Sequence, residues 1–200
     1  MEKNHRRRGK ELENAILDAA WTSMQSIGYA QLTMDDIATA AHTNKNAIYR
    51  RWDTKLAVIS DAGKRALSQG DYVSPMTVEE PNTGSLRDDL IALLSIPLPI
   101  IELTGRENVK ALVQDYLPHL TFKTTDFLLS DSFLQRYLTG ILDRAHNRGD
   151  IPLSATDIPT VVKRQPAIQL LANLLSDEPY DAATIALWVD RILLPLFKTA

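Results

Sequence analysis

The chain has 200 residues, of which 44% are hydrophobic and 24% are charged, values typical of a folded protein with one or two small domains. It contains no cysteine, which excludes disulfides, thiolate metal sites and cysteine nucleophiles. No apolar run reaches the ~18 residues of a membrane span, and no apolar stretch of a secretory signal follows the basic start MEKNHRRRGK. The cytoplasm is therefore the expected location.

Charge is distributed unevenly along the chain. Residues 1–65 carry 11 Lys/Arg and 8 Asp/Glu, a net charge of +3, whereas residues 66–200 carry 11 and 17, a net charge of −6. A basic first third on an acidic remainder indicates that only the first third meets a polyanion such as nucleic acid.

Nearly the whole chain is predicted to be helical, because apolar residues recur at three- and four-residue steps and no long stretch alternates as a strand would. Residues 70–84 hold Gly, Pro, Ser and Asn and are predicted to form a loop. In chain order the predicted helices span about 10–27, 34–41, 45–51, 54–69, a helix from 85 that Pro97 and Pro99 kink or end, then 107–119, 125–147, 155–176 with a kink at Pro166, and 181–197.

Local signals mark the first helix boundaries. Gly28 suits a left-handed helix stop. Thr33 can cap the second helix, with Asp36 three residues on where a capping box needs an acid. Asn44 and Thr54 can cap the third and fourth helices.

Two short helices separated by a tight turn and braced by longer ones form a helix-turn-helix, whose second short helix enters the major groove of DNA. The predicted reading helix is polar at its start, where Lys and Asn can bond base edges, while Ile48 should face the core and Ala47 could touch a thymine methyl. Phosphate contacts are expected from residues on this helix and just after it, namely Tyr49, Arg50, Arg51 and Lys55.

Residues 14–59 as a whole resemble the DNA-binding domain of the TetR family of regulators. The matching segments are Ile16-Leu17, Ala19-Ala20, Gly28-Tyr29, Leu32 to Ala38, Ala41, Ala47 to Trp52, and Lys55. The resemblance implies an all-α homodimer with a helix-turn-helix domain at residues 1–55 and a ligand-binding and dimerisation domain at residues 56–200. Together with the residue pattern, it implies DNA contacts at Thr33, Thr43, Asn44, Lys45, Asn46, Tyr49, Arg50 and Lys55.

The chain departs from the family pattern at the turn, where His42 stands in place of the usual Gly and Thr43 in place of an aliphatic residue. His42 is either a plain turn residue with positive φ or a DNA contact. The basic residues Arg6 to Lys10 either reach phosphates or the minor groove, or form a tail that only adds electrostatic attraction.

The second half resembles the C-terminal domains of the same family more loosely, through the helix end at residues 142–151. The family usually dimerises through its last two helices as a four-helix bundle. The apolar candidates for that interface, each of which faces either the partner or the core of its own chain, are Ile168, Leu171, Leu175, Ile185, Trp188, Val189 and Ile192.

A pocket for a small, largely apolar effector is expected among residues 86–148, because aromatic and apolar walls with a few polar tips suit such a ligand. The same side chains would serve equally well as core. The candidates are Leu94, Pro97, Tyr116, His119, Phe122, Phe127, Phe133 and Tyr137.

The expected function is that of a sequence-specific homodimeric repressor, released from a palindromic operator by the effector. One alternative is a ligand-dependent activator or corepressor-type regulator. The other is a non-specific architectural DNA-binding protein, for which a more basic chain is expected. An enzyme is disfavoured, because the four His residues show no metal-ligand spacing and no P-loop, G-x-G-x-x-G or G-x-S-x-G motif is present. No cofactor, metal or membrane partner is expected.

Overall fold

The computed structural model describes residues 9–69, 78–119 and 133–200. In these ranges every regular element is helical, which confirms the all-α prediction. The described residues divide into two compact units: unit 1 contains residues 9–69 and 104–116, and unit 2 contains the others. No helix in the described ranges is both long and apolar enough to cross a membrane.

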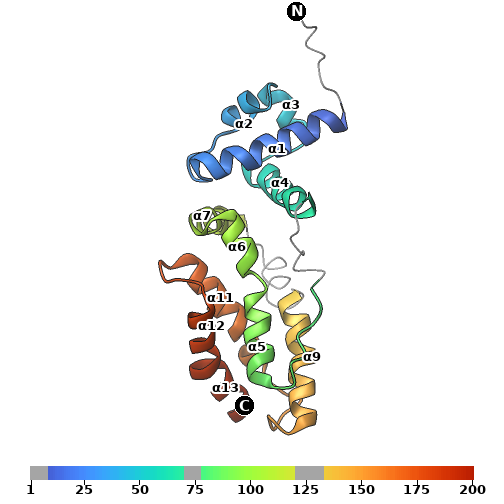
Figure 1. Ribbon diagram of the computed structural model, residues 1–200, viewed down its shortest axis with the longest axis vertical. Helices are drawn as coiled ribbons and strands as arrows, with labels where there is room; N and C mark the ends of the chain where they lie inside the picture. The colour runs from blue at the N-terminus through green and yellow to red at the C-terminus, as the bar shows by residue number, and fades with distance from the viewer. Residues whose placement is uncertain (1–8, 70–77, 120–132) are drawn as a thin grey trace, which may run out of the picture. The chain divides into compact units, whose positions relative to one another are not determined.

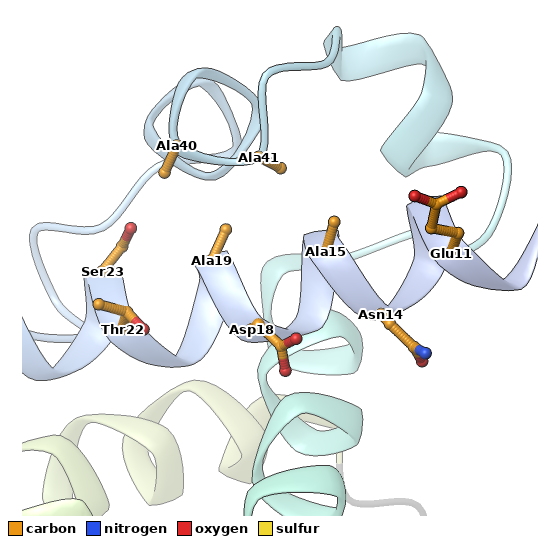
Figure 2. A pocket seen from close by; sticks show the side chains of 9 residues that line it. All are labelled: Glu11, Asn14, Ala15, Asp18, Ala19, Thr22, Ser23, Ala40 and Ala41. Carbon is orange, nitrogen blue, oxygen red and sulfur yellow. The ribbon is translucent and has the colours of Figure 1, made fainter. Parts of the chain in front are cut away.

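Unit 1 is built on its first helix. Figure 1 and Figure 2 show α2 on one side of α1 and α4 on the other. The five helices of this unit are α1 (Lys10–Ile27), α2 (Met34–Ala40), α3 (Lys45–Tyr49), α4 (Lys55–Gln69) and α7 (Arg106–Tyr116). Their shared core is apolar and includes Ile16, Ala20, Met24, Ile37, Ile48, Val58 and Ile59.

The predicted caps of unit 1 are confirmed. The Thr33 hydroxyl accepts a hydrogen bond from Asp36 N, and the Asp36 carboxylate accepts one from Thr33 N, which completes the capping box. Asn44 Oδ1 accepts from Ala47 N at 3.0 Å, and Thr54 Oγ1 accepts from Ala57 N at 3.1 Å. These bonds satisfy amide groups that each helix start leaves without a partner.

The turn between α2 and α3 has left-handed backbone at His42, with φ of 52°. This is the conformation that glycine adopts at low cost and that histidine tolerates better than most residues. His42 N donates to Thr39 O and Thr43 N to Ala38 O, so that the turn closes directly onto the end of α2. His42 is therefore the left-handed residue of the turn, and its exposed side chain leaves the DNA contact a prediction.

Unit 2 is organised around α5 (Leu86–Ser95), which lies between α9 and α12 (Figure 1). Its buried residues Leu90, Leu93 and Leu94 face this packing. The remaining helical elements of this unit are α6 (Leu98–Thr104, whose last residue belongs to unit 1), η1 (Leu117–His119), α9 (Phe133–Arg148), α10 (Thr160–Lys163), α11 (Gln165–Leu175), α12 (Ala182–Trp188), the π-helical turn η2 (Val189–Leu193) and α13 (Leu194–Thr199).

Two polar contacts fix α5 in unit 2. The guanidinium of Arg87 bonds both carboxylate oxygens of Asp190 in η2, at 2.7 and 2.9 Å. The buried carboxylate of Asp89 accepts from the backbone and the hydroxyl of Thr83, at 2.6 and 2.7 Å. Such paired donors offset the cost of burying a carboxylate, and they anchor the segment before the helix.

Proline decides where the predicted helices of unit 2 divide. The segment 155–176 is not one kinked helix: its helical part is α10 and α11, separated at Arg164, two residues before Pro166. α5 ends at Ser95, and a further helix, α6, follows Pro97. Pro195 has no backbone N–H and cannot donate the helical hydrogen bond to the preceding turn. The predicted last helix changes to the π-helical turn η2 just before this proline.

The two compact units do not divide the chain after residue 55, where the domain boundary was predicted. α4 belongs to unit 1 because Val58, Ile59 and Ala62 are buried in the same core as α1. α7 belongs to it as well, although residues 75–103 of unit 2 separate it from α4 in the chain. The predicted loop at 70–84 and helix at 125–147 lie partly outside the described residues.

Candidate DNA-binding site

The helix-turn-helix presents one face of α3. Ile48 is buried in the core of unit 1 and Ala47 is only 8% exposed, whereas Asn44, Lys45 and Asn46 are exposed at the start of the helix. Ala47 lies outside the core cluster and presents little surface, and the thymine-methyl contact at this position stays a prediction. The polar start of α3 is the part that can approach base edges.

Two of the polar side chains at this helix start, Asn44 and Lys45, already have a local role. Asn44 is the N-cap, and Thr43 in the turn is half-buried. Lys45 Nζ forms an ion pair with Asp35 of α2 at 2.5 Å, and this hydrogen bond raises the pKa of Lys45 above its ordinary value. The pair joins the two short helices and keeps Lys45 charged.

The opposite end of α3 carries exposed groups suited to phosphate. Tyr49 is 47% exposed, a high value for so large an apolar ring. Arg50 Nε donates to Asn46 O at 3.1 Å, and Arg51 Nη1 donates to Ala47 O at 2.9 Å. Each guanidinium retains further donors beyond the one used here. Thr33, at the start of α2, is exposed as well.

Lys55, the first residue of α4, is half-buried and not a freely solvated cation. Its ammonium donates to the backbone carbonyl of Tyr29 at 2.8 Å and lies 4.1 Å from the centre of the Tyr29 ring. A carbonyl oxygen and an aromatic face both attract a cation. Tyr29 thus sets where the ammonium of Lys55 sits.

Sequence reasoning missed the partners of Tyr29 on α7. Tyr29 N donates to Asn108 Oδ1 at 2.7 Å, and the Tyr29 hydroxyl donates to the Asp115 carboxylate. The sequence does contain a pattern that indicates this helix face. Three- and four-residue steps place on one face of α7 the residues Asn108, Ala111, Leu112 and Asp115.

A shallow groove of about 570 Å³ lies in unit 1 between α1 and the end of α2. Figure 2 shows Ala15, Ala19 and Ser23 pointing toward Ala40 and Ala41, which leaves the groove open because these side chains are small. It is lined by none of the residues predicted for effector binding.

The structure describes the side chains of four of those eight residues, and they belong to two different units. In unit 2, Leu94 is fully buried and Pro97 is half-buried. Tyr137, also in unit 2, is buried, and its hydroxyl donates a hydrogen bond to Val78 O at 2.5 Å. Tyr116 belongs to unit 1 and is exposed. Phe122 and Phe127, and the side chains of His119 and Phe133, lie outside the described residues.

The predicted interface residues divide into core and surface. Ile185 and Val189 are fully buried within unit 2 and Trp188 is 8% exposed, so these three side chains pack in the core of their own unit. Ile168 and Leu171 are exposed, at 41% and 37%, while Leu175 and Ile192 are half-buried. Two exposed apolar residues were not predicted: Val161 at 66% and Leu187 at 58%.

The residues that the structure covers contain no group of three or more His, Asp or Glu placed to hold a metal ion. The basic arm at Arg6, Arg7 and Arg8 precedes the first described residue.

Comparison with known proteins agrees with this geometry. Residues 16–69 match the family described as "Bacterial regulatory proteins, tetR family". The chain is 31% identical to the DNA-binding transcriptional repressor TetR of Mycobacteroides abscessus, over 96% of each chain. It is 27% identical to an uncharacterized HTH-type transcriptional regulator of Mycobacterium bovis, over 92% of this chain and 86% of that one.

Among solved structures, a TetR family transcription regulator shares the fold with a TM-score of 0.54 and 24% identity, covering 92% of this chain and 97% of the other. Together with the exposed polar start of α3, these relationships identify a DNA-binding transcriptional regulator and not an enzyme. The chain belongs to the tetR family of bacterial regulatory proteins.

Proposed function

We propose that the protein is a homodimeric repressor that binds a near-palindromic operator through α3 and leaves it when a small, largely apolar ligand binds. The observation that carries the proposal is the exposed polar start of α3, with Asn44, Lys45 and Asn46 on a helix whose other face is buried. The relative that is 31% identical over nearly the whole chain is named as a repressor, which supports the direction of regulation.

Base reading is assigned to the start of α3 and phosphate binding to its flanks. Thr43, Asn44, Lys45 and Asn46 are proposed to face base edges, where amide and ammonium groups discriminate between base pairs. Thr33, Tyr49, Arg50 and Lys55 are proposed to contact the phosphates on either side, which fixes the register of the reading helix without reading sequence.

Dimerisation is assigned to the exposed apolar side chains of α10, α11 and α12. Val161, Ile168, Leu171 and Leu187 are the large apolar residues exposed in this part of unit 2. Burial of their side chains against the same surface of a second chain removes apolar area from water and creates a twofold-symmetric interface. Such a dimer presents two α3 helices to two half-sites, about one helical turn apart.

Release follows if the effector binds more tightly to a dimer whose reading helices are wrongly spaced. A coupling free energy of about 1–3 kcal/mol between the two sites changes DNA affinity roughly five- to 150-fold. The effector site is placed in unit 2, and α4, which begins at Lys55 and ends at the edge of unit 1, is the proposed lever.

The test is selection of bound DNA from a random pool by the purified protein, followed by exposure of the selected complex to a panel of small molecules. A palindromic sequence released by a compound supports the proposal. A palindrome bound only in the presence of a compound identifies a corepressor-type regulator or ligand-dependent activator instead. Failure to enrich any sequence, with strong binding to all DNA at low salt, would indicate an architectural protein.

A further inference from the structure

Tyr29 lies at the point where α7 meets the helix-turn-helix, directly after Gly28 at the end of α1. Its side chain is only 2% exposed. Three of its groups are bonded: its N–H donates to Asn108, its hydroxyl donates to Asp115, and its carbonyl accepts from Lys55. A side chain held at both ends in this way has one available orientation.

α7 docks on this residue along a single face. Asn108 and Asp115 are two helical turns apart, and between them Ala111 and Leu112 pack against the core of unit 1. Asn108 is itself oriented, since its Nδ2 donates to Thr104 O at 2.9 Å. Gly28, which precedes Tyr29, has a φ of 83°, a left-handed backbone that favours glycine.

The hydroxyl of Tyr29 is suited to act as a permanent donor. Burial, followed by the hydrogen bond to Asp115, raises the pKa of Tyr29 far above its ordinary value. The phenol therefore stays protonated and able to donate at neutral pH.

The same ring carries the cation of Lys55. One donor of the ammonium is used by the Tyr29 carbonyl, and the ring face lies beneath the group at 4.1 Å. An ammonium has three donors, so two remain for a phosphate. A lysine held in place loses less side-chain freedom on binding DNA than a freely moving one.

We propose that Asn108 and Asp115 of α7 are positioning residues for DNA binding: they fix Tyr29, and Tyr29 holds the ammonium of Lys55 ready for the DNA backbone. The proposal rests on the phosphate contact assigned to Lys55 in the proposed function. On this proposal α7, which begins more than fifty residues after the end of α3, contributes to DNA binding.

The test compares Asp115→Ala with Asp115→Asn on the selected operator. Both variants remove one negative charge, which by itself favours DNA binding, but only Asn keeps an oxygen that can accept from the Tyr29 hydroxyl. Asp115→Ala is expected to bind about three- to tenfold more weakly than Asp115→Asn. Tyr29→Phe, which removes the hydroxyl with no change in charge, is expected to weaken binding by a similar factor relative to the wild type.

A structural role alone would be recognised by repeating the comparison with Lys55→Ala in the background. If α7 acts through Lys55, the difference between Ala and Asn at position 115 disappears there. The slope of log K against log salt is expected to be lower for Asp115→Ala than for Asp115→Asn, by up to about 0.9 for one lost phosphate contact.

Three results overturn the proposal and are distinguishable. Equal affinities of the two Asp115 variants, with Lys55→Ala clearly weakened, would remove α7 from the site and leave the proposed function intact. An equal loss with and without Lys55 would show that Asp115 acts only on folding. A Lys55→Ala variant that binds like the wild type, with the same salt slope, would remove the phosphate contact on which both proposals depend.

Discussion

The ammonium of Lys55 lies 2.8 Å from the carbonyl oxygen of Tyr29 and 4.1 Å from the centre of its ring. The two residues belong to different helix junctions, 26 positions apart in the chain. The contact places a positive charge at the first turn of α4, where backbone N–H groups also favour an anion.

This contact predicts that charge, and not only packing, matters at position 55. Lys55→Ala should weaken binding to operator and to random DNA alike, and should lower the salt slope by about one. Lys55→Arg keeps the charge and is expected to retain the slope. Titration of labelled DNA at several salt concentrations measures both, and an unchanged slope in Lys55→Ala would contradict the phosphate assignment.

Asn46 is predicted to read one operator position. It is exposed at the start of α3, and an Asn side chain can bond adenine at N6 and N7. Asn46→Ala should relax the preference at that position, at a cost of about 1–3 kcal/mol against the preferred base, while the remaining positions keep theirs. Repeating the selection with the variant tests this, and recovery of the parental sequence logo would show that Asn46 is not a reader.

The capping box of α2 is predicted to contribute to stability independently of DNA. Thr33→Ala removes the acceptor for Asp36 N and should lower the free energy of unfolding by about 1 kcal/mol. Thr33→Ser retains the hydroxyl and is the matched control. Urea unfolding followed by circular dichroism compares the two, and equal midpoints would show that the cap is not required.

Acid should destabilise the fold partly through the same cap. Hydrogen bonds from Thr33 lower the pKa of Asp36 below its ordinary value of 3.8. A carboxylate whose pKa is lower in the folded state stabilises it fully above the ordinary value, and this contribution is lost as the pH falls through the lowered one. The wild type should therefore lose more stability than Asp36→Asn as the pH falls below about 4. Parallel acid titrations of the two proteins would reject this if their losses were the same.

The dimer surface is predicted to be sensitive to charge at Leu187. Leu187→Glu places like charges against an apolar surface on both chains of a symmetric dimer and should shift the protein toward monomer. Asn147→Glu makes the same change of charge on an exposed position of α9 and serves as control. Sedimentation velocity measures the association, and a Leu187→Glu protein that remains as dimeric as the control would place the interface elsewhere.

The sequence alone determined the local structure of the helix-turn-helix. Thr33 with Asp36, Asn44 with Ala47, and Thr54 with Ala57 are pairs three residues apart, so the side chain and the amide that it caps are brought together by the helix start itself. The turn at His42 is local in the same sense, because a positive φ depends on the residue and its immediate neighbours.

Only the tertiary structure decided which apolar faces are covered and which distant residues meet. Ile185, Leu187 and Trp188 are all apolar residues of one predicted helix, yet α5 packs against α12, and Leu187 alone of the three is left exposed. Likewise, Tyr29 and Asp115 are 86 positions apart, and nothing near either residue specifies the other as its partner. Helix propensity acts over a few residues, whereas these contacts depend on how whole helices pack against one another, and a single sequence does not contain that information in any local pattern.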